Sequence, residues 1–381
     1  MRFLHTGDWH VGKTLRGRSR ADEHRAVLGE IVAIAREAKV DVALIAGDLF
    51  DSPSPSPESE EIVYRTLLDL ARVVEWVVVI SGNHDNPRRL AAVEPLLRLT
   101  NIRVLPSIAR PSEGGVITLQ TRLGGAQVAL LPFLSQRAIV KADDLMMKDA
   151  SQHVGDYAER AARIIEALSA ESPPPRTVNI LLAHAMVHGG KLGGGERSAH
   201  TIFEYGIPTT AFPGAFHYVA LGHLHRAQKL AGACPIWYAG SPLQLDFGET
   251  EDVKSVNLVD AEPSSPARVE SVRLTSGRRL RFVRAKLEEL ETLATELGDA
   301  YLKVVIAHAP VPGLAQKVRD ILPNAVDVLI ATKTEEPKPS ASRIGRTPRE
   351  LFSDYLDEHG GPVPELLSLF DELLDEVYAT D

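Results

Sequence analysis

The chain of 381 residues contains a single cysteine, Cys234, and no long uninterrupted apolar segment. One cysteine excludes an internal disulfide and a thiolate-rich metal site, so any metal would be bound by imidazole, carboxylate or amide groups. No run approaches the ~20 apolar residues of a membrane-spanning helix, and the N-terminal residues turn polar at once. We therefore expect a cytoplasmic protein with no membrane contact.

Basic residues are fewer than acidic residues in this chain. The chain has 42 Lys and Arg against 51 Asp and Glu, which gives a net charge of −9. This balance argues against a protein that coats nucleic acid by charge alone, although it permits a local basic groove. With 44% hydrophobic residues, the chain is long enough for one large core and one or two accessory domains.

The pattern of apolar residues predicts an α/β fold. Strand-like and helix-like segments alternate up to about residue 130, and Ser56-Pro57 is typical of a helix start. This alternation predicts α/β units with a largely parallel sheet. Later strand-like runs, such as 178–183 and 218–221, have fewer helices between them and suggest a second, more antiparallel sheet. We expect two packed sheets flanked by helices.

The composition changes after Ala261. Residues 268–286 carry seven basic residues against one acidic, and a helix, strand, helix, strand pattern then extends to Ala331. The segment 333–348 is rich in Pro, Ser and Lys, as linkers are. Residues 350–381 hold ten acidic residues, no Lys or Arg, and two amphipathic stripes that two short helices cannot bury alone. We therefore expect boundaries that separate 1–270, 271–332, 333–348 and 349–381.

Side chains that can bind metal follow several predicted strands. They are Asp8, His10, Asp48, Asn83, His184, His223 and His225. The carboxyl ends of strands in an α/β sheet are where such folds place their sites. If residues 8–10 are extended, Asp8 and His10 point the same way and reach one ion. Imidazole, carboxylate and amide donors without thiolate suit Mn²⁺, and they also fit Fe or Zn, whereas so many imidazoles fit Mg²⁺ less well.

The same N-terminal segment also supports a different interpretation. GDWHVGKT, residues 7–14, fits the phosphate-binding loop G-x-x-x-x-G-K-[ST], and residues 41–48 would then be an acidic Walker B strand of a nucleotide triphosphatase. Such a loop leads directly into a helix, whereas Gly17 interrupts the residues after Thr14. The Asp8 carboxylate would also repel phosphate. We interpret the match as a coincidence of spacing.

The ordered motifs DxH, GD, GNHD, H and GHxH resemble the calcineurin-like metallophosphoesterase superfamily. The resemblance implies a four-layer αββα sandwich of two mixed sheets and hydrolysis of phosphoesters by two divalent metal ions. It assigns to the first ion Asp8, His10, Asp48 and His225, and to the second Asp48, Asn83, His184 and His223. It makes His84 the group that protonates the leaving oxygen or stabilises the charge that builds there, and Asp51 and Asp85 are the nearest candidates to orient that ring.

Longer stretches, MRFLHTGDWHVGK, AGDLFDS, ISGNHD, YVALGHLHRAQ and WYAGSPLQLDFGE, are similar to the SbcD and Mre-type double-strand-break repair nucleases. This resemblance implies an Mn²⁺-dependent exonuclease on double-stranded DNA and endonuclease on single strands and hairpins, associated with the nucleoid. It implies a homodimer and an SbcC-like coiled-coil ATPase as partner. Residues 1–270 would be the nuclease domain, 271–332 a small αβ capping domain that grips DNA, and 349–381 a helical module that binds the ATPase.

Two further alternatives stay open. One is action on another phosphoester, but serine/threonine phosphatases continue Gly-Asp into Val-Asp-Arg-Gly, whereas this chain has Leu49-Phe50-Asp51-Ser52. Cyclic-nucleotide phosphodiesterases of the superfamily usually lack the C-terminal modules. The other alternative is a noncatalytic scaffold for the ATPase, which predicts that neither metal chelation nor His84→Gln changes function.

Overall fold

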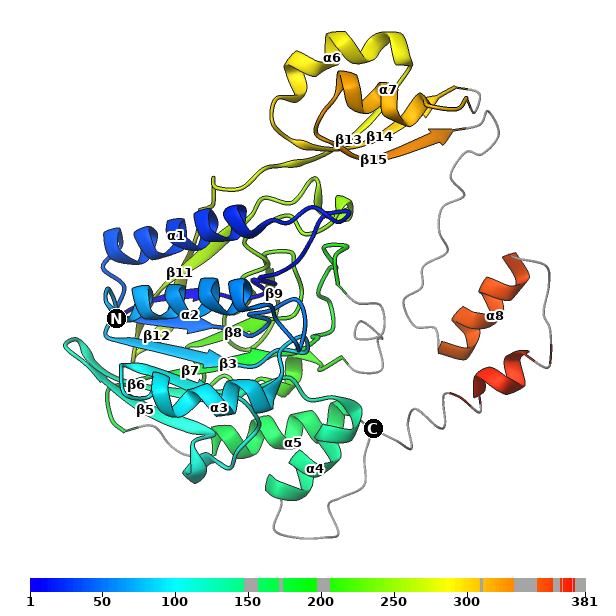
Figure 1. The fold of residues 1–381 in the computed structure, drawn as a ribbon. Coiled ribbons are helices and arrows are strands. Elements are labelled where there is room, and N and C mark those ends of the chain that lie inside the picture. Colours follow the sequence, from blue (N-terminus) through cyan, green and yellow to red (C-terminus); the bar gives the residue numbers. More distant parts are fainter. Residues whose placement is uncertain are drawn as a thin grey trace.

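The computed structural model describes residues 1–146, 157–170, 174–196, 206–308, 311–331, 348–358, 364, 366–371 and 373. Within this part of the chain the strands form two six-stranded sheets and one three-stranded sheet (Figure 1). The two large sheets stack face to face between helices, and the small sheet lies beside them with helices of its own.

The first large sheet has the strand order β12-β11-β1-β2-β3-β4. Its strands are β1 (Arg2–Thr6), β2 (Val42–Ile45), β3 (Trp76–Ile80), β4 (Ile102–Leu105), β11 (Ser255–Glu262) and β12 (Ser265–Arg273). The first four are parallel, and β11 and β12 extend the sheet in antiparallel fashion. Its outer face is covered by α1 (Ala21–Glu37), α2 (Pro57–Ala71) and α3 (Pro87–Leu97).

Two of these helices, α2 and α3, begin at side-chain caps followed by proline. The Ser56 hydroxyl caps α2 by accepting from the main-chain N–H of Ser59 at 3.2 Å, and Pro57 occupies the first turn, as the sequence predicts. The Asn86 side chain caps α3 in the same way, with Pro87 next in the chain. Both starts lie just after strand ends, so they fix the paths of the two loops that carry candidate site residues.

The second large sheet has the order β5-β6-β7-β8-β10-β9. Its strands are β5 (Val116–Thr121), β6 (Gly124–Leu131), β7 (Thr177–His184), β8 (Tyr218–Gly222), β9 (Gln228–Leu230) and β10 (Ile236–Tyr238). The four central strands are parallel, and only the two edge strands are antiparallel, so the expectation of a more antiparallel sheet is wrong. The sequence missed this because the connection from β8 to β10 runs through the short strand β9 rather than a helix.

Helices α4 (Gln136–Met146) and α5 (Tyr157–Ser169) cover the outer face of the second sheet. Phe3, Leu44 and Val78 of the first sheet pack between the sheets, against Val128 and Ile180 of the second. Strands buried on both faces need near-continuous apolar runs, which explains the VALI sequence of β2. The layers are therefore helix, sheet, sheet, helix, which confirms the predicted αββα sandwich of two mixed sheets.

The third sheet is parallel and has the order β13-β14-β15. Its elements are β13 (Leu280–Ala285), α6 (Leu290–Leu297), β14 (Tyr301–Ala307), α7 (Leu314–Ile321) and β15 (Ala325–Ala331). These elements bury a core of their own. Two contacts join this small sheet to the loop between β1 and α1. Leu15 packs with Leu280 and Tyr301, and the Arg16 guanidinium lies 2.9 Å from the Asp327 carboxylate. The basic segment 268–286 is thus divided between β12 and β13, in two different sheets.

Four short 3₁₀ helices complete the described elements. They are Pro111–Glu113, Thr209–Ala211, Phe247–Glu249 and Leu287–Glu289. Residues 333–347 of the predicted linker lie outside the described residues. The predicted domain boundaries remain predictions.

The C-terminal region contains helical segments, as predicted. Helix α8 (Pro348–Glu358) packs on the helical residues 366–371. The rings of Phe352 and Phe370 stack at 4.3 Å between centroids, and the Arg349 guanidinium lies 2.8 Å from the Asp371 carboxylate. Among the described residues, no helix is both long enough and apolar enough to span a bilayer.

Candidate metal centre

The candidate ligands meet at one edge of the two stacked sheets. Asp8 and His10 follow β1, Asp48 follows β2, and Asn83 follows β3. His184 is the last residue of β7, and His223 and His225 follow β8. These five strands all end at the same edge, because β1 to β3 and β7 to β8 are parallel sets. The seven candidate side chains, which are spread over residues 8–225 of the sequence, therefore lie close together.

One half of the cluster surrounds the amide oxygen of Asn83. This Oδ1 atom lies 2.9 Å from Nε2 of His184 and 2.8 Å from Nδ1 of His223. The Asp48 carboxylate lies 3.5 Å from the same His184 nitrogen. Four donor atoms thus lie close together, as the ligands of one ion would.

The other half of the cluster also includes Asp48. The Oδ2 atom of Asp48 is 3.4 Å from Nε2 of His10. The rings of His10 and His225 are 4.8 Å apart between centroids. Asp8, Asp48 and His184 also offer donor atoms within 4.8 Å of one another. Asp48 therefore belongs to both halves, which is the position of a bridging ligand.

The hydrogen bonding of His10 tests whether a metal ion fits this cluster. Its ring is buried, and neither ring nitrogen makes a hydrogen bond of good geometry to the described residues, since the nearest carboxylate oxygens, of Asp48 and Asp51, lie 3.4 and 3.5 Å away. A buried polar group without a partner costs about 1–3 kcal/mol, so such atoms need another explanation. A divalent cation bound through Nε2 would provide one. Buried imidazole and carboxylate donors without thiolate fit such an ion well.

The backbone at the ligands is strained. Asp8, His10 and Asp48 have φ values of 50°, 47° and 50°, and His223 has 107°. Positive φ is uncommon for residues other than glycine and clusters at functional sites. Asp8 and His10 therefore do not lie in an extended segment, so the predicted convergence occurs, but the periodicity argument for it is wrong. A Cβ at Gly82 would overlap the Asp48 carboxylate, which explains that glycine.

The charges of the cluster are unfavourable without a cation. Burial raises the pKa of Asp8 well above its usual range, and the neighbouring Asp48 carboxylate raises it further. Burial lowers the pKa of the His10 and His184 imidazoles well below the usual value. A bound cation reverses the first effect and accepts the lone pairs of neutral imidazoles. The electrostatics therefore favour deprotonated, metal-binding forms once an ion is present.

Two of the candidate ligand rings are oriented by hydrogen bonds from their Nδ1 atoms. His184 Nδ1 donates to the main-chain oxygen of Ala46 at 2.7 Å, and His225 Nδ1 donates to the Glu249 carboxylate at 3.0 Å. Outer partners of this kind set the tautomer and orientation of metal-binding histidines. The sequence pattern indicates no role for Glu249, although this residue ends the stretch WYAGSPLQLDFGE. No local pattern links it to His225.

His84 lies at the edge of the cluster. Its Nδ1 donates to the main-chain oxygen of Asp51 at 2.9 Å, and its ring meets that of His10 edge-on at 4.5 Å. The Asp51 carboxylate lies closer to Lys13 Nζ, at 3.2 Å, and to His10 Nδ1, at 3.5 Å, than to His84 Nδ1, at 3.9 Å. Asp51 therefore holds the His84 ring through its backbone.

Asp85 braces the loops of the site. Its buried carboxylate accepts from the main-chain N–H groups of Gly82, Phe50 and Leu49 at 2.9, 3.1 and 3.3 Å. Burial raises its pKa to about 6, although these hydrogen bonds oppose the rise. The carboxylate thus joins the loop after β2 to the loop after β3, and these contacts orient the backbone around His84.

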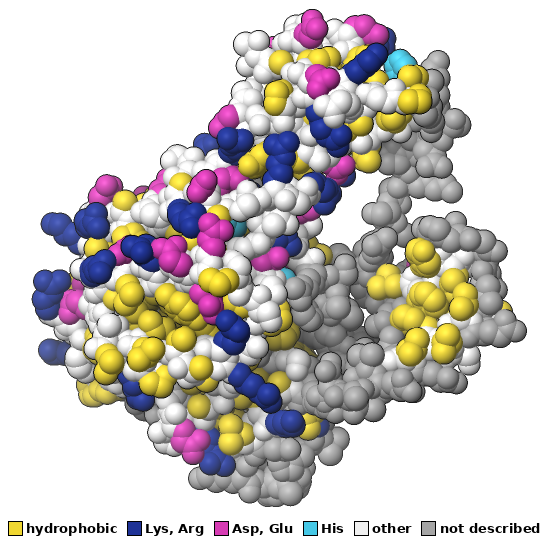
Figure 2. Space-filling view, in the orientation of Figure 1, with side chains coloured by type: hydrophobic (Ala, Val, Ile, Leu, Met, Phe, Trp, Pro, Cys, Tyr) yellow, Lys and Arg dark blue, Asp and Glu magenta, His cyan; other side chains and the backbone are white. Residues whose placement is uncertain are grey.

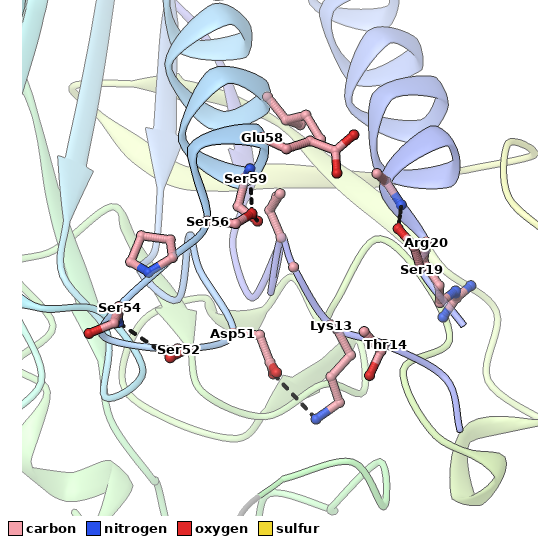
Figure 3. A pocket seen from close by; sticks show the side chains of 15 residues that line it. Lys13, Thr14, Ser19, Arg20, Asp51, Ser52, Ser54, Ser56, Glu58 and Ser59 are labelled. Carbon is pink, nitrogen blue, oxygen red and sulfur yellow. Dashed lines mark hydrogen bonds and ion pairs between the residues drawn. The ribbon is translucent and has the colours of Figure 1, made fainter. Parts of the chain in front are cut away.

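A pocket of about 250 Å³ is lined by Asp51, whose carboxylate lies 3.5 Å from the candidate ligand His10 (Figure 3). Its lining includes Lys13, Asp51 and the serines at 52, 54, 56 and 59. Lys13 points toward Asp51 in Figure 3 rather than into a phosphate-binding loop. Helix α1 begins only at Ala21, so no helix follows Lys13-Thr14 directly. The geometry of a nucleotide triphosphatase is therefore absent from this segment.

Comparisons with known proteins agree with this geometry. Residues 1–227 match the calcineurin-like phosphoesterase family, and residues 276–360 match a family described as the type 5 capsule protein repressor C-terminal domain (SbcD_C). The first match covers more than half of the chain. The chain therefore belongs to the calcineurin-like phosphoesterases, the class that its four-layer fold and histidine-carboxylate cluster define.

Similar proteins narrow the assignment. The SbcD subunit of the nuclease SbcCD from Bacillus subtilis is 35% identical over 74% of this chain and 71% of its own length. The SbcD subunits of Rhodobacter capsulatus and Escherichia coli are 37% and 31% identical, each over 68% of this chain and over 66% and 64% of their own lengths. Within its class the chain belongs to the SbcD family and is a metal-dependent nuclease subunit. The chain thus spans about two thirds of the length of these relatives.

A solved dimetal phosphatase from Danio rerio aligns with 73% of this chain and 99% of its own, with a TM-score of 0.38 and 11% identity. That likeness is too low to add to the assignment.

Proposed function

We propose that this nuclease hydrolyses DNA phosphodiesters with two Mn²⁺ ions. The observation that carries the proposal is the convergence of seven donor side chains at one edge of the sandwich, where the Asp48 carboxylate contacts both His10 and His184. Two ions at such a site supply a hydroxide near neutral pH and neutralise the phosphate oxygens. A donor set rich in imidazole favours Mn²⁺ over Mg²⁺.

The protein's own residues would complete the reaction. His84, with Nδ1 held by the Asp51 carbonyl, would protonate the leaving oxygen through its second ring nitrogen. The buried Asp85 carboxylate keeps the two loops around that ring in register. The polar pocket beside Lys13 and Asp51 would receive part of the substrate strand next to the ions (Figure 3).

Basic side chains support DNA as the substrate. Figure 2 shows Lys and Arg side chains gathered where the small sheet meets the nuclease part. Arg279, Arg281 and Arg284 are exposed in and just before β13. Such residues bind backbone phosphates without reading sequence. We therefore propose that residues 271–332 form a capping domain that grips duplex DNA, which would associate the protein with the nucleoid.

A panel of phosphoesters in Mn²⁺ tests the proposed substrate. We expect the chain, with its ATPase partner present, to cut duplex and hairpin DNA and to leave a phosphomonoester and a cyclic nucleotide largely intact. EDTA should abolish cutting, and Mn²⁺ added back should restore it. Hydrolysis of the small phosphoesters without DNA cutting would instead favour a phosphatase or cyclic-nucleotide phosphodiesterase. Cutting that persists in EDTA would contradict a metal-dependent site.

The C-terminal helices support a coiled-coil ATPase as partner. Phe352 and Phe370 pack on each other, whereas Tyr355 and Leu369 remain about half exposed. Figure 2 shows hydrophobic side chains gathered on this helical module. An exposed apolar helix face is what helix-in-groove recognition uses. We propose that residues 349–381 bind the coiled coil of an SbcC-like ATPase.

Substitutions on that exposed face test the partner. We expect Tyr355→Glu combined with Leu369→Glu to weaken binding of the coiled-coil ATPase by ~10²-fold or more, because two buried apolar side chains contribute ~1.5–3 kcal/mol each. Leu123→Glu is the matched control, since Leu123 is exposed in the turn between β5 and β6. Titration of the partner onto immobilised chain measures the affinities. Equal affinities for the double variant and the wild type would refute the assignment.

Exposed leucines on α2 and α3 support a homodimer. Leu68 on α2, Leu96 on α3 and Leu99 after α3 are exposed, and Figure 2 shows hydrophobic side chains gathered over these helices. Large exposed apolar patches mark interaction sites. Sedimentation velocity of the chain measures the state, and a persistent monomer would contradict this part of the proposal.

A further inference from the structure

We propose that Glu249, held in place by Lys254, is a positioning residue that orients His225 for one of the two metal ions. The proposal rests on the two-metal site proposed above. It adds to that site a buried ion pair and an expected difference between the two ions.

Glu249 is fully buried, and both of its carboxylate oxygens are engaged. Oε1 accepts from His225 Nδ1 at 3.0 Å. Oε2 lies 2.7 Å from Lys254 Nζ and accepts from the main-chain N–H of Leu245 at 3.0 Å. The carboxylate is thus fixed on one side by a cation and a backbone amide, and it presents its other oxygen to the imidazole.

Lys254 fixes the backbone of the same ligand. Its ammonium group donates to the main-chain oxygen of His225 at 3.0 Å and to the Ser241 hydroxyl at 2.9 Å. The side chain and the backbone of His225 are therefore held by the two members of one ion pair. A proton fixed on Nδ1 leaves the Nε2 lone pair for a metal ion.

The ligand ring of His184, in the other half of the cluster, is held differently. His184 Nδ1 donates to a neutral carbonyl, that of Ala46, whereas His225 Nδ1 donates to a carboxylate. A carboxylate partner increases the basicity of the imidazole and strengthens its bond to metal. We therefore expect the two ions to depend unequally on Glu249.

Hydrogen bonds from Gln244 stabilise the loop that contains Glu249. The Gln244 side-chain amide donates to the main-chain oxygens of Glu249, Thr250 and Asp252 at 2.9, 3.0 and 3.2 Å. The loop therefore keeps its path without the Glu249 carboxylate. A buried ion pair adds little stability compared with apolar groups of similar volume, so its retention here points to a role at His225.

The test compares metal binding by the full-length apo chain and its variants. Glu249→Leu combined with Lys254→Met removes the buried pair together and avoids leaving one charge alone. We expect the melting temperature of the apo double variant to stay near that of the wild type. Mn²⁺ titration followed by electron paramagnetic resonance should show one ion bound ~10–100-fold more weakly and the other unchanged. A single-ion spectrum should replace the coupled two-ion spectrum at intermediate Mn²⁺.

Two further variants sharpen the result. Glu249→Gln keeps an acceptor for His225 Nδ1 but loses the charge, so we expect it to weaken the same ion by a smaller factor. Asp143→Asn is the matched control, because Asp143 is an equally buried carboxylate, paired with Arg163 at 2.6 Å between α4 and α5. It should affect stability and leave both ions unchanged.

Two outcomes would overturn the proposal. One is wild-type binding of both ions in the double variant and in Glu249→Gln. The other is equal weakening of both ions, which would indicate a general structural role. If the wild type itself does not bind two ions, the two-metal function fails instead, so the two failures are distinguishable.

Discussion

Replacing Asp48 by asparagine is expected to remove at least one ion and to reduce DNA cutting by ~10³-fold or more, since the metal ions supply several kcal/mol of transition-state stabilisation. The Asp48 carboxylate lies 3.4 Å from His10 Nε2 and 3.5 Å from His184 Nε2, so it serves both halves of the cluster. Asparagine keeps the acceptor for the main-chain N–H of His84, which Asp48 Oδ1 accepts at 2.8 Å. The substitution therefore removes the charge and preserves the loop.

Metal content after desalting and initial rates on duplex DNA measure this effect. Asp41→Asn is the matched control because Asp41 precedes the same strand, β2, and accepts from the main-chain N–H of Arg2 at 2.7 Å. Asp41 lies at the end of the strand opposite to the site, so its variant should keep both ions and nearly full activity. Two retained ions and unimpaired cutting in the Asp48 variant would eliminate the bridging role.

The predicted fold and ligand cluster depend on information that is local in the sequence. Apolar runs with polar residues at their ends placed Asp8, Asp48 and His184 at one sheet edge, because parallel strands end on the same side. The details at the ligands depend instead on loop conformation. The positive φ values of Asp8 and His10 show a turn where the residue pattern suggested an extended segment.

The parts that sequence could not supply depend on contacts between distant residues. Glu249 reaches His225 across 24 positions, and neither residue type nor spacing indicates that pairing. The hydrogen bond from His84 to the Asp51 main-chain oxygen cannot be predicted from the sequence for a different reason, since every residue type has a main-chain carbonyl. The candidates Asp51 and Asp85 were therefore near the ring, but their carboxylates contact Lys13, His10 and main-chain amides.

The second large effect is expected at His84. We expect His84→Gln to slow DNA cutting by ~10²–10⁴-fold, the usual contribution of a general acid, while both ions stay bound. A ring nitrogen of His84 lies within 4.8 Å of donor atoms of His10 and Asp48, so the residue is close enough to be a ligand by distance alone. Its Nδ1, however, donates to the Asp51 carbonyl, which directs the ring along the edge of the cluster.

Metal content and turnover together separate these two roles. His24→Gln is the matched control, because His24 is also buried and its Nδ1 meets a main-chain oxygen, that of Arg20, at 3.0 Å. His24 lies on α1 away from the ligands, so its variant should change stability more than activity. Slow cutting with two bound ions in His84→Gln would identify His84 as the proton donor. Loss of an ion would make His84 a ligand, and unimpaired cutting with both ions bound would exclude both roles.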